Sequence, residues 1–133
     1  MISIIDRPIR TNELCRRYGV TKRQVEYAVK KGTVAAPNGP ANRTGIAWQW
    51  SPNEQLGMIV AARLRYQVDE GAIRDAVELV EAHRSPWGRV LYFDHVSPEL
   101  TEVRLLTAAQ AEQRVNRSGK KVVTFLPLPG LEA

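Results

Sequence analysis

Cysteine is almost absent from this chain: Cys15 is the only one among 133 residues. A single thiol cannot close a disulfide within the chain or build a thiolate metal cluster, so neither can stabilise the fold. Because Cys15 falls on the inward side of a predicted helix, we interpret it as a small core residue rather than a nucleophile. The scarcity of cysteine favours a reduced, cytoplasmic setting.

Long apolar runs and assembled catalytic motifs are missing as well. No run approaches the roughly 18 apolar residues of a membrane span, and the first residues lack the pattern of a secretion signal. The sequence contains no glycine-rich phosphate loop and no nucleophile elbow, and His83 and His95 lack a metal-ligand spacing. Asp94 and His95 are neighbours on a predicted strand, so their side chains point to opposite faces. We therefore expect no membrane association, no enzyme activity, no cofactor and no metal site.

Positive charge is what the chain has in excess, and it is unevenly distributed. The formal net charge is +5. Residues 1–50 carry nine Lys or Arg against three Asp or Glu, residues 51–87 carry four against six, and residues 88–133 carry six against five. The excess lies in the first 50 residues, which favours an anionic partner for that part of the chain.

Residues 11–31 predict two short helices joined by a tight turn. Thr11 and Thr21 can cap the two helices, and Gly19 ends the first, because glycine enters the left-handed region of a helix C-cap without steric cost. The second helix, over residues 22–31, carries hydrogen-bond donors on its outward side. Such a pair of helices can place its second helix in the DNA major groove. The alternative is a helical hairpin whose charged side is only solvated.

Turn-forming residues and a strong helix start follow this pair. Residues 32–50 suit a hairpin wing with its tip at residues 38–39 or 42–45. Ser51 and Glu54 have the spacing of a capping box, which predicts a third helix over residues 52 to about 66. A fourth helix is expected from its cap, Asp69, to about residue 83. We expect Trp50 to lie in the core under the third helix.

The order of elements over about residues 9–82 resembles the DNA-binding domain of the mercury-resistance regulator (MerR) family of winged helix-turn-helix proteins. The resemblance is carried by residues 13–21 (Glu-Leu-Cys-Arg-Arg-Tyr-Gly-Val-Thr), residues 25–32 (Val-Glu-Tyr-Ala-Val-Lys-Lys-Gly) and residues 48–50 (Trp-Gln-Trp). It implies that the second helix and the wing contact double-stranded DNA. The contact residues expected from it are Thr21, Lys22, Arg23, Gln24, Glu26, Tyr27, Lys30, Lys31, Arg43 and Trp48.

The chain departs from that family at several positions. The family commonly has an arginine at the position of Glu26 and an aromatic-arginine pair at the positions of Ala47 and Trp48. An acidic group beside phosphates is unfavourable unless it accepts a hydrogen bond from a cytosine amino group. The family's long dimerising helix is also absent, because residues 85–88 (Ser-Pro-Trp-Gly) end the helical pattern.

After residue 88 the pattern becomes extended. Strands are expected over residues 89–96, 102–106 and 121–126, with a short helix after Thr107. The predicted fold class is therefore α+β, mainly helical, with a winged helix-turn-helix domain (residues 1–84) followed by a small strand-strand-helix-strand unit (residues 89–128).

The first strand of this unit is apolar on both faces, so it needs a second covering layer. That layer can be the helical domain or the same unit of another subunit. We predict a homodimer held by this unit, with Leu91 and Phe93 in the interface.

Two hypotheses about function follow from these patterns. The first is a sequence-specific double-stranded DNA-binding protein, acting as a transcriptional regulator (a repressor or an antitoxin-like autoregulator) or as a recombination accessory factor. The second is a winged-helix module that binds another protein, for which Glu26 and exposed Trp48 and Trp50 side chains are the argument.

Overall fold

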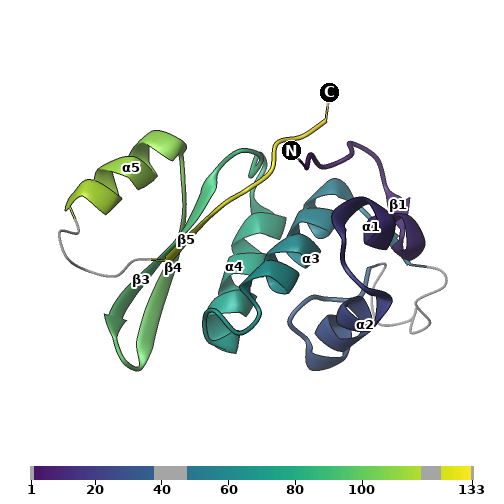
Figure 1. Cartoon of the computed structure of the whole chain (residues 1–133), viewed down its shortest axis with the longest axis horizontal. Helices are drawn as coiled ribbons and strands as arrows, with labels where there is room; N and C mark the ends of the chain where they lie inside the picture. Colours follow the sequence, from purple (N-terminus) through teal and green to yellow (C-terminus); the bar gives the residue numbers. More distant parts are fainter. Residues whose placement is uncertain (1, 38–47, 118–123, 133) are drawn as a thin grey trace.

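The computed structural model describes residues 2–37, 48–117 and 124–132. Within them the chain has an α+β fold with five helices and two small antiparallel sheets, which confirms the predicted class (Figure 1). The helices are α1 (Thr11–Tyr18), α2 (Lys22–Lys31), α3 (Pro52–Leu64), α4 (Glu70–Ala82) and α5 (Ala108–Arg117). The strands are β1 (Ile9–Arg10), β2 (Gln49–Trp50), β3 (Val90–Ser97), β4 (Leu100–Leu106) and β5 (Thr124–Pro127). None of the described helices is long and apolar enough to cross a membrane.

Most helix starts lie where the sequence places them, because side chains cap them locally. The Ser51 hydroxyl accepts a hydrogen bond from the Glu54 amide (3.3 Å), and the Glu54 carboxylate accepts one from the Ser51 amide (3.0 Å). Asp69 accepts from the Ala72 amide at the start of α4. The prediction that Thr11 caps α1 was wrong. The N-cap position is held by Arg10 without a side-chain hydrogen bond, and Thr11 is the first helical residue.

A buried polar network ties α1, β2 and the N-terminal segment to α3. The Tyr18 hydroxyl donates to Gln55 Oε1 (2.6 Å) and accepts from the Ile5 amide (3.1 Å). Gln55 is fully buried, and its amide nitrogen donates to the carbonyls of Arg7 (2.8 Å) and Trp50 (3.0 Å). Because each of these buried groups has a partner, the network fixes α1 against α3 without leaving an orphaned polar atom.

The three-stranded sheet is ordered β4-β3-β5 and lies between α4 and α5 (Figure 1). Leu91 and Phe93 are fully buried in the same apolar cluster as the residues of α3 and α4. Tyr92 is buried on the opposite face of β3, and Ala111 of α5 is buried as well. The covering layers on both faces of β3 therefore come from the same chain.

This arrangement corrects the predicted dimer interface. Leu91 and Phe93 have no exposed surface. They cannot contact a second copy without first leaving the core of their own chain. The order strand, strand, helix, strand is as predicted, with β5 at Thr124–Pro127; residues 121–123 of the last predicted strand lie outside the described residues.

The segment after β5 returns to the helices and holds the sheet against them. The Ile4 amide donates to the Gly130 carbonyl (2.8 Å), and the Glu132 amide donates to the Ile4 carbonyl (2.7 Å). Ile4 itself is fully buried. Arg17 on α1 pairs with the Glu132 carboxylate at 2.7 Å. Residues from opposite ends of the described chain therefore lie side by side (Figure 1).

Candidate nucleic-acid interface

The turn between α1 and α2 positions the second helix. Gly19 has φ +70° and its amide donates to the Cys15 carbonyl at 3.0 Å, which is the left-handed C-cap that the sequence predicts. Val20 is buried in the turn. Thr21 has extended backbone angles and caps α2, as expected.

The cap of α2 uses two of the predicted contact residues. The Gln24 amide donates to Thr21 Oγ1 (3.1 Å), and the Thr21 amide donates to Gln24 Oε1 (2.9 Å). Two of the first backbone donors of α2 are therefore satisfied within the helix start. Thr21 and Gln24 position α2. The Gln24 NH₂ group and the Thr21 O–H are not used in this cap, and both can donate to an outside partner.

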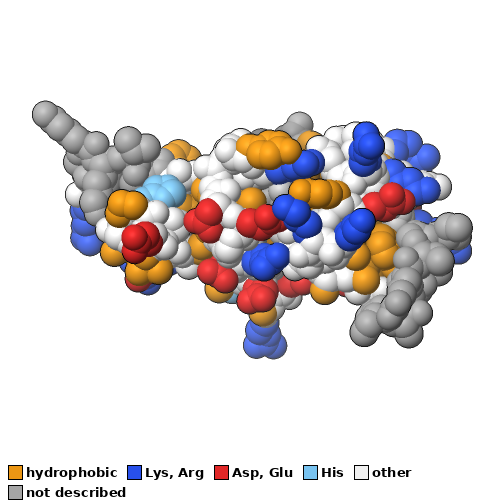
Figure 2. All heavy atoms as spheres, turned by 90° about the horizontal axis from the view of Figure 1, so that it is seen from below, with side chains coloured by type: hydrophobic (Ala, Val, Ile, Leu, Met, Phe, Trp, Pro, Cys, Tyr) orange, Lys and Arg blue, Asp and Glu red, His pale blue; other side chains and the backbone are white. Residues whose placement is uncertain are grey.

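The outward side of α2, here called the α2 face, consists of four exposed charged side chains and one exposed tyrosine. Its members are Lys22, Arg23, Glu26, Tyr27 and Lys30. None of its three cations is in an ion pair with a residue that the structure describes. Figure 2 shows that Lys and Arg gather toward the half of the molecule where α2 lies, whereas Asp and Glu gather toward the middle. The α2 face therefore presents positive charge that is open to an anionic partner.

The ring of Tyr27 on α2 is contacted by two cations, one from α2 and one from the end of α3. The Lys31 ammonium lies 5.0 Å from the centroid of the Tyr27 ring, and the Arg65 guanidinium carbon lies 4.7 Å from it. Arg65 is also 4.8 Å from the centroid of Tyr66. The guanidinium thus contacts two aromatic rings, an arrangement that holds a cation in place while its edge can still donate hydrogen bonds.

Tyr66 has an unusual backbone conformation. Its φ is +67°, in the left-handed region, and its side chain is 88 % exposed. For a residue with a Cβ atom this conformation costs about 1 to 2 kcal/mol. The ring gains little burial in return, so the turn after α3 presents Tyr66 to solvent beside Arg65. Neither this conformation nor the stacking was foreseen, because no residue pattern signals either one.

Lys31 is less available than the other cations of α2. Its ammonium lies 3.2 Å from a carboxylate oxygen of Glu70, and its backbone carbonyl accepts a hydrogen bond from Arg74. Hydrogen bonds to Tyr27 and Glu70 raise the pKa of Lys31, and the same Lys31 contact lowers the pKa of Glu70. The ion pair is exposed and therefore weak, but the carboxylate of Glu70 offsets the positive charge that Lys31 offers to a phosphate.

The aromatic pair Trp48 and Trp50 is structural. Trp48 is only 4 % exposed and packs edge to face against Trp50, with ring centroids 5.9 Å apart at an interplanar angle of 89°. Trp50 is fully buried, as expected, and its indole N–H donates to Thr11 Oγ1 at 3.0 Å. The predictions that Trp48 faces DNA and that exposed tryptophans bind a protein partner were wrong. The predicted wing tip, with Arg43, lies outside the described residues.

No protein-family model matches the chain, and no curated protein matches it either. The comparisons thus neither support nor oppose the resemblance drawn from the sequence. The site must be judged on its own geometry. That geometry consists of a capped helix after a glycine turn, open cations along it, and an arginine held between two tyrosines at its flank.

Proposed function

We propose that the chain is a sequence-specific double-stranded DNA-binding protein of the winged helix-turn-helix type. In this role it acts as a transcriptional regulator, either a repressor or an antitoxin-like autoregulator, or as a recombination accessory factor. The observation that carries the proposal is the α2 face, whose cations project from a helix that is rigidly capped at its first turn. A helix of ten residues is about 15 Å long, which suits insertion into a major groove.

The positions of the cations along α2 assign them different tasks. Lys22 and Arg23 stand in the first turn of the helix, the part that meets base edges when such a helix enters the groove. Lys30 stands in the last turn of α2, and the Arg65 guanidinium lies against the ring of Tyr27 on the same helix. The two ends therefore suit different contacts: bases at the start of α2, and phosphates at its end.

Glu26 is the residue that most constrains this proposal. It lies one turn from both Arg23 and Lys30, where opposite charges on a helix attract each other. Near phosphates its carboxylate is unfavourable, but in the groove it can accept a hydrogen bond from the amino group of cytosine. The proposal therefore includes a C·G pair in the recognised site, opposite the middle of α2.

The competing hypothesis, a winged-helix module that binds protein through the same surface, loses its main support. Trp48 and Trp50 were its aromatic anchors, and both are buried. On the α2 face, Tyr27 is the largest apolar side chain, and cations surround it. A surface rich in open cations and poor in apolar anchors suits nucleic acid better than a protein partner.

A homodimer was expected for recognition of an inverted repeat. Because Leu91 and Phe93 are buried in their own core, a homodimer has to form through other surfaces. Light scattering on the free protein and on its DNA complex measures the stoichiometry directly.

The experiment begins with selection from a random duplex pool at low salt, followed by fluorescence anisotropy on the selected site. We expect Arg23→Ala to weaken binding by about 1 to 3 kcal/mol and to relax the preference at one base pair. Lys30→Ala should weaken all sequences alike and reduce the slope of log K against log salt by about one. Arg117→Ala, which removes an exposed cation from α5, is the matched control. If Arg23→Ala and Lys30→Ala both bind DNA as the wild type does, α2 is not part of the interface.

A further inference from the structure

The outer edge of β4 carries no strand. Among the described residues β4 pairs only with β3, and the sheet ends there. β4 spans seven residues, Leu100–Leu106, so a row of backbone N–H and C=O groups faces away from β3. Such an edge is a template for an added strand unless charge, a bulge or a covering element blocks it.

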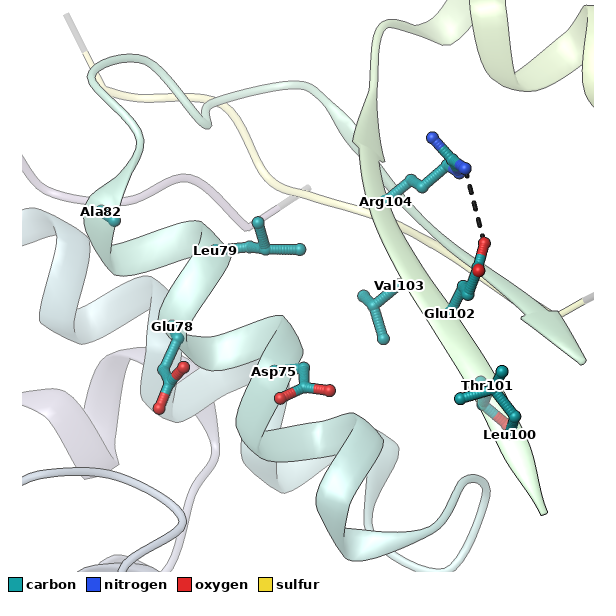
Figure 3. A pocket seen from close by; sticks show the side chains of 9 residues that line it. All are labelled: Asp75, Glu78, Leu79, Ala82, Leu100, Thr101, Glu102, Val103 and Arg104. Carbon is teal, nitrogen blue, oxygen red and sulfur yellow. Dashed lines mark hydrogen bonds and ion pairs between the residues drawn. The ribbon is translucent and has the colours of Figure 1, made fainter.

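A groove runs between this edge and α4, and it has a volume of about 650 Å³ (Figure 3). Its β4 side is formed by the consecutive residues 100–104. Successive side chains of a strand point to opposite faces, so a run of consecutive residues along one wall means that the main-chain edge itself lines the groove. The volume is within the range of about 300 to 1000 Å³ typical of ligand clefts.

The groove combines apolar contacts with acidic charge. Leu79 on α4 and Val103 on β4 point toward each other across it (Figure 3). Leu79 is 38 % exposed. Asp75 and Glu78 line the α4 wall, and no lysine or arginine of α4 lines the groove with them. The one cation of the lining, Arg104, already pairs with a carboxylate of β4 at 3.4 Å.

This charge selects the kind of occupant. The chain is basic overall, yet the groove is acidic, so a nucleic acid is repelled here and a cationic partner is attracted. A second copy of the chain is also disfavoured, because a symmetric contact through this groove brings two Asp75 and two Glu78 side chains together. An open strand edge requires a partner with an extended main chain.

We propose that the groove between α4 and β4 binds an extended segment of another protein as an added strand on β4. The residues of that segment that face α4, every second one along the strand, include both apolar side chains and lysine or arginine. Main-chain hydrogen bonds to the edge of β4 align the segment. Its apolar side chains pack on Leu79 and Val103, and its cations meet Asp75 and Glu78. No residue of α2 lines this groove, so the inference goes beyond the proposed DNA binding and does not depend on it.

The probe is a fluorescently labelled eight-residue peptide with valine at positions 1 and 5, lysine at positions 3 and 7 and threonine at the even positions, so that valine and lysine share one face. It is compared with a matched peptide that has glutamate in place of lysine. Anisotropy measures binding to the full chain, and amide exchange locates it. We expect the lysine peptide to bind about tenfold more tightly, because it faces two carboxylates rather than opposing them. Exchange should slow at every second amide of residues 100–104, since alternate N–H groups of β4 point away from β3 and can donate to the added strand.

Two double variants test whether the carboxylates of Asp75 and Glu78 cause the preference for the lysine peptide. Asp75→Asn with Glu78→Gln should bring the two peptides to within about threefold of each other. Asp6→Asn with Glu112→Gln, which removes two exposed charges outside the groove, should leave the tenfold preference unchanged. Equal binding of the two peptides by the wild type, or protection at residues other than those lining the groove, overturns the proposal. The proposal is also overturned if light scattering shows that the wild-type chain dimerises and amide exchange shows that its β4 amides are protected in the dimer.

Discussion

The carboxyl group of Glu81 provides the sharpest test of the packing between α3 and α4. Its Oε1 is buried and has no hydrogen-bond partner among the described residues. It lies against α3, where a Cβ atom added at Gly57 would approach it to 2.6 Å. Burial, followed by the charges of Glu54 and Glu78, raises the pKa of Glu81 from 4.5 to about 7. Its place in the last turn of α4, at the negative end of the helix dipole, disfavours the charged form further.

This pKa makes the stability of the fold depend on pH. The folded state holds the Glu81 proton more tightly than the unfolded chain does, so its contribution is fully present below about pH 4.5 and is lost as the pH rises through about 7. The full difference corresponds to about 3 kcal/mol, but Glu81 is partly exposed and solvent screens it, so we expect about 1.5 kcal/mol. In Glu81→Gln this pH dependence disappears.

The measurement is urea unfolding followed by tryptophan fluorescence at pH 5, 6, 7 and 8, for the wild type and Glu81→Gln. Between pH 5 and pH 8, the free energy of unfolding of the wild type should fall by about 1.5 kcal/mol more than that of Glu81→Gln does. Glu112→Gln, at an exposed position of α5, controls for loss of a carboxylate and should show no such change. A difference between wild type and Glu81→Gln that is the same at pH 5 and pH 8 would refute the reasoning.

Two further predictions concern helix ends. Gly19→Ala should lower the free energy of unfolding by about 1 kcal/mol, because φ is +70° at this position. The space around the new Cβ atom is open, so the loss comes from the backbone conformation and not from a clash. Gly130→Ala, at a glycine without positive φ, should cost less. Asn53→Ala should cost about 1 to 2 kcal/mol in the same urea assay, since the Asn53 amide donates to the Val80, Glu81 and His83 carbonyls at the end of α4; unchanged stability would mean that water replaces it fully.

Short-range features of this protein could be read from the sequence because neighbouring residues create them. The capping box at Ser51, the caps at Thr21 and Asp69 and the left-handed Gly19 each involve groups within four residues, and each is present. Thr11 is the exception, because it was predicted to cap α1 and does not. Its hydroxyl accepts from the distant Trp50 indole, so a tertiary contact replaced the local cap.

For the candidate site too, the sequence predicted some features and could not predict others. Helical periodicity alone placed Lys22, Arg23 and Lys30 on an exposed side of α2, and the structure agrees. It could not show that Arg65 stacks on Tyr27, since that contact joins two helices 38 positions apart in the chain. Nor could it show that Lys31 is partly neutralised by the carboxylate of Glu70, which begins α4.

Burial of large apolar side chains was decided by tertiary packing. Residue type shows that Trp48, Leu91 and Phe93 gain from leaving water, but it does not say which surface covers them. The choice between the chain's own core and a partner depends on where α4 and the neighbouring strands come to lie. In this protein α4 packs against the sheet and covers Leu91 and Phe93, and Trp50 covers Trp48 edge to face. The hydrophobic effect has no direction, so a sequence determines which residues must be buried, and only the fold determines what buries them.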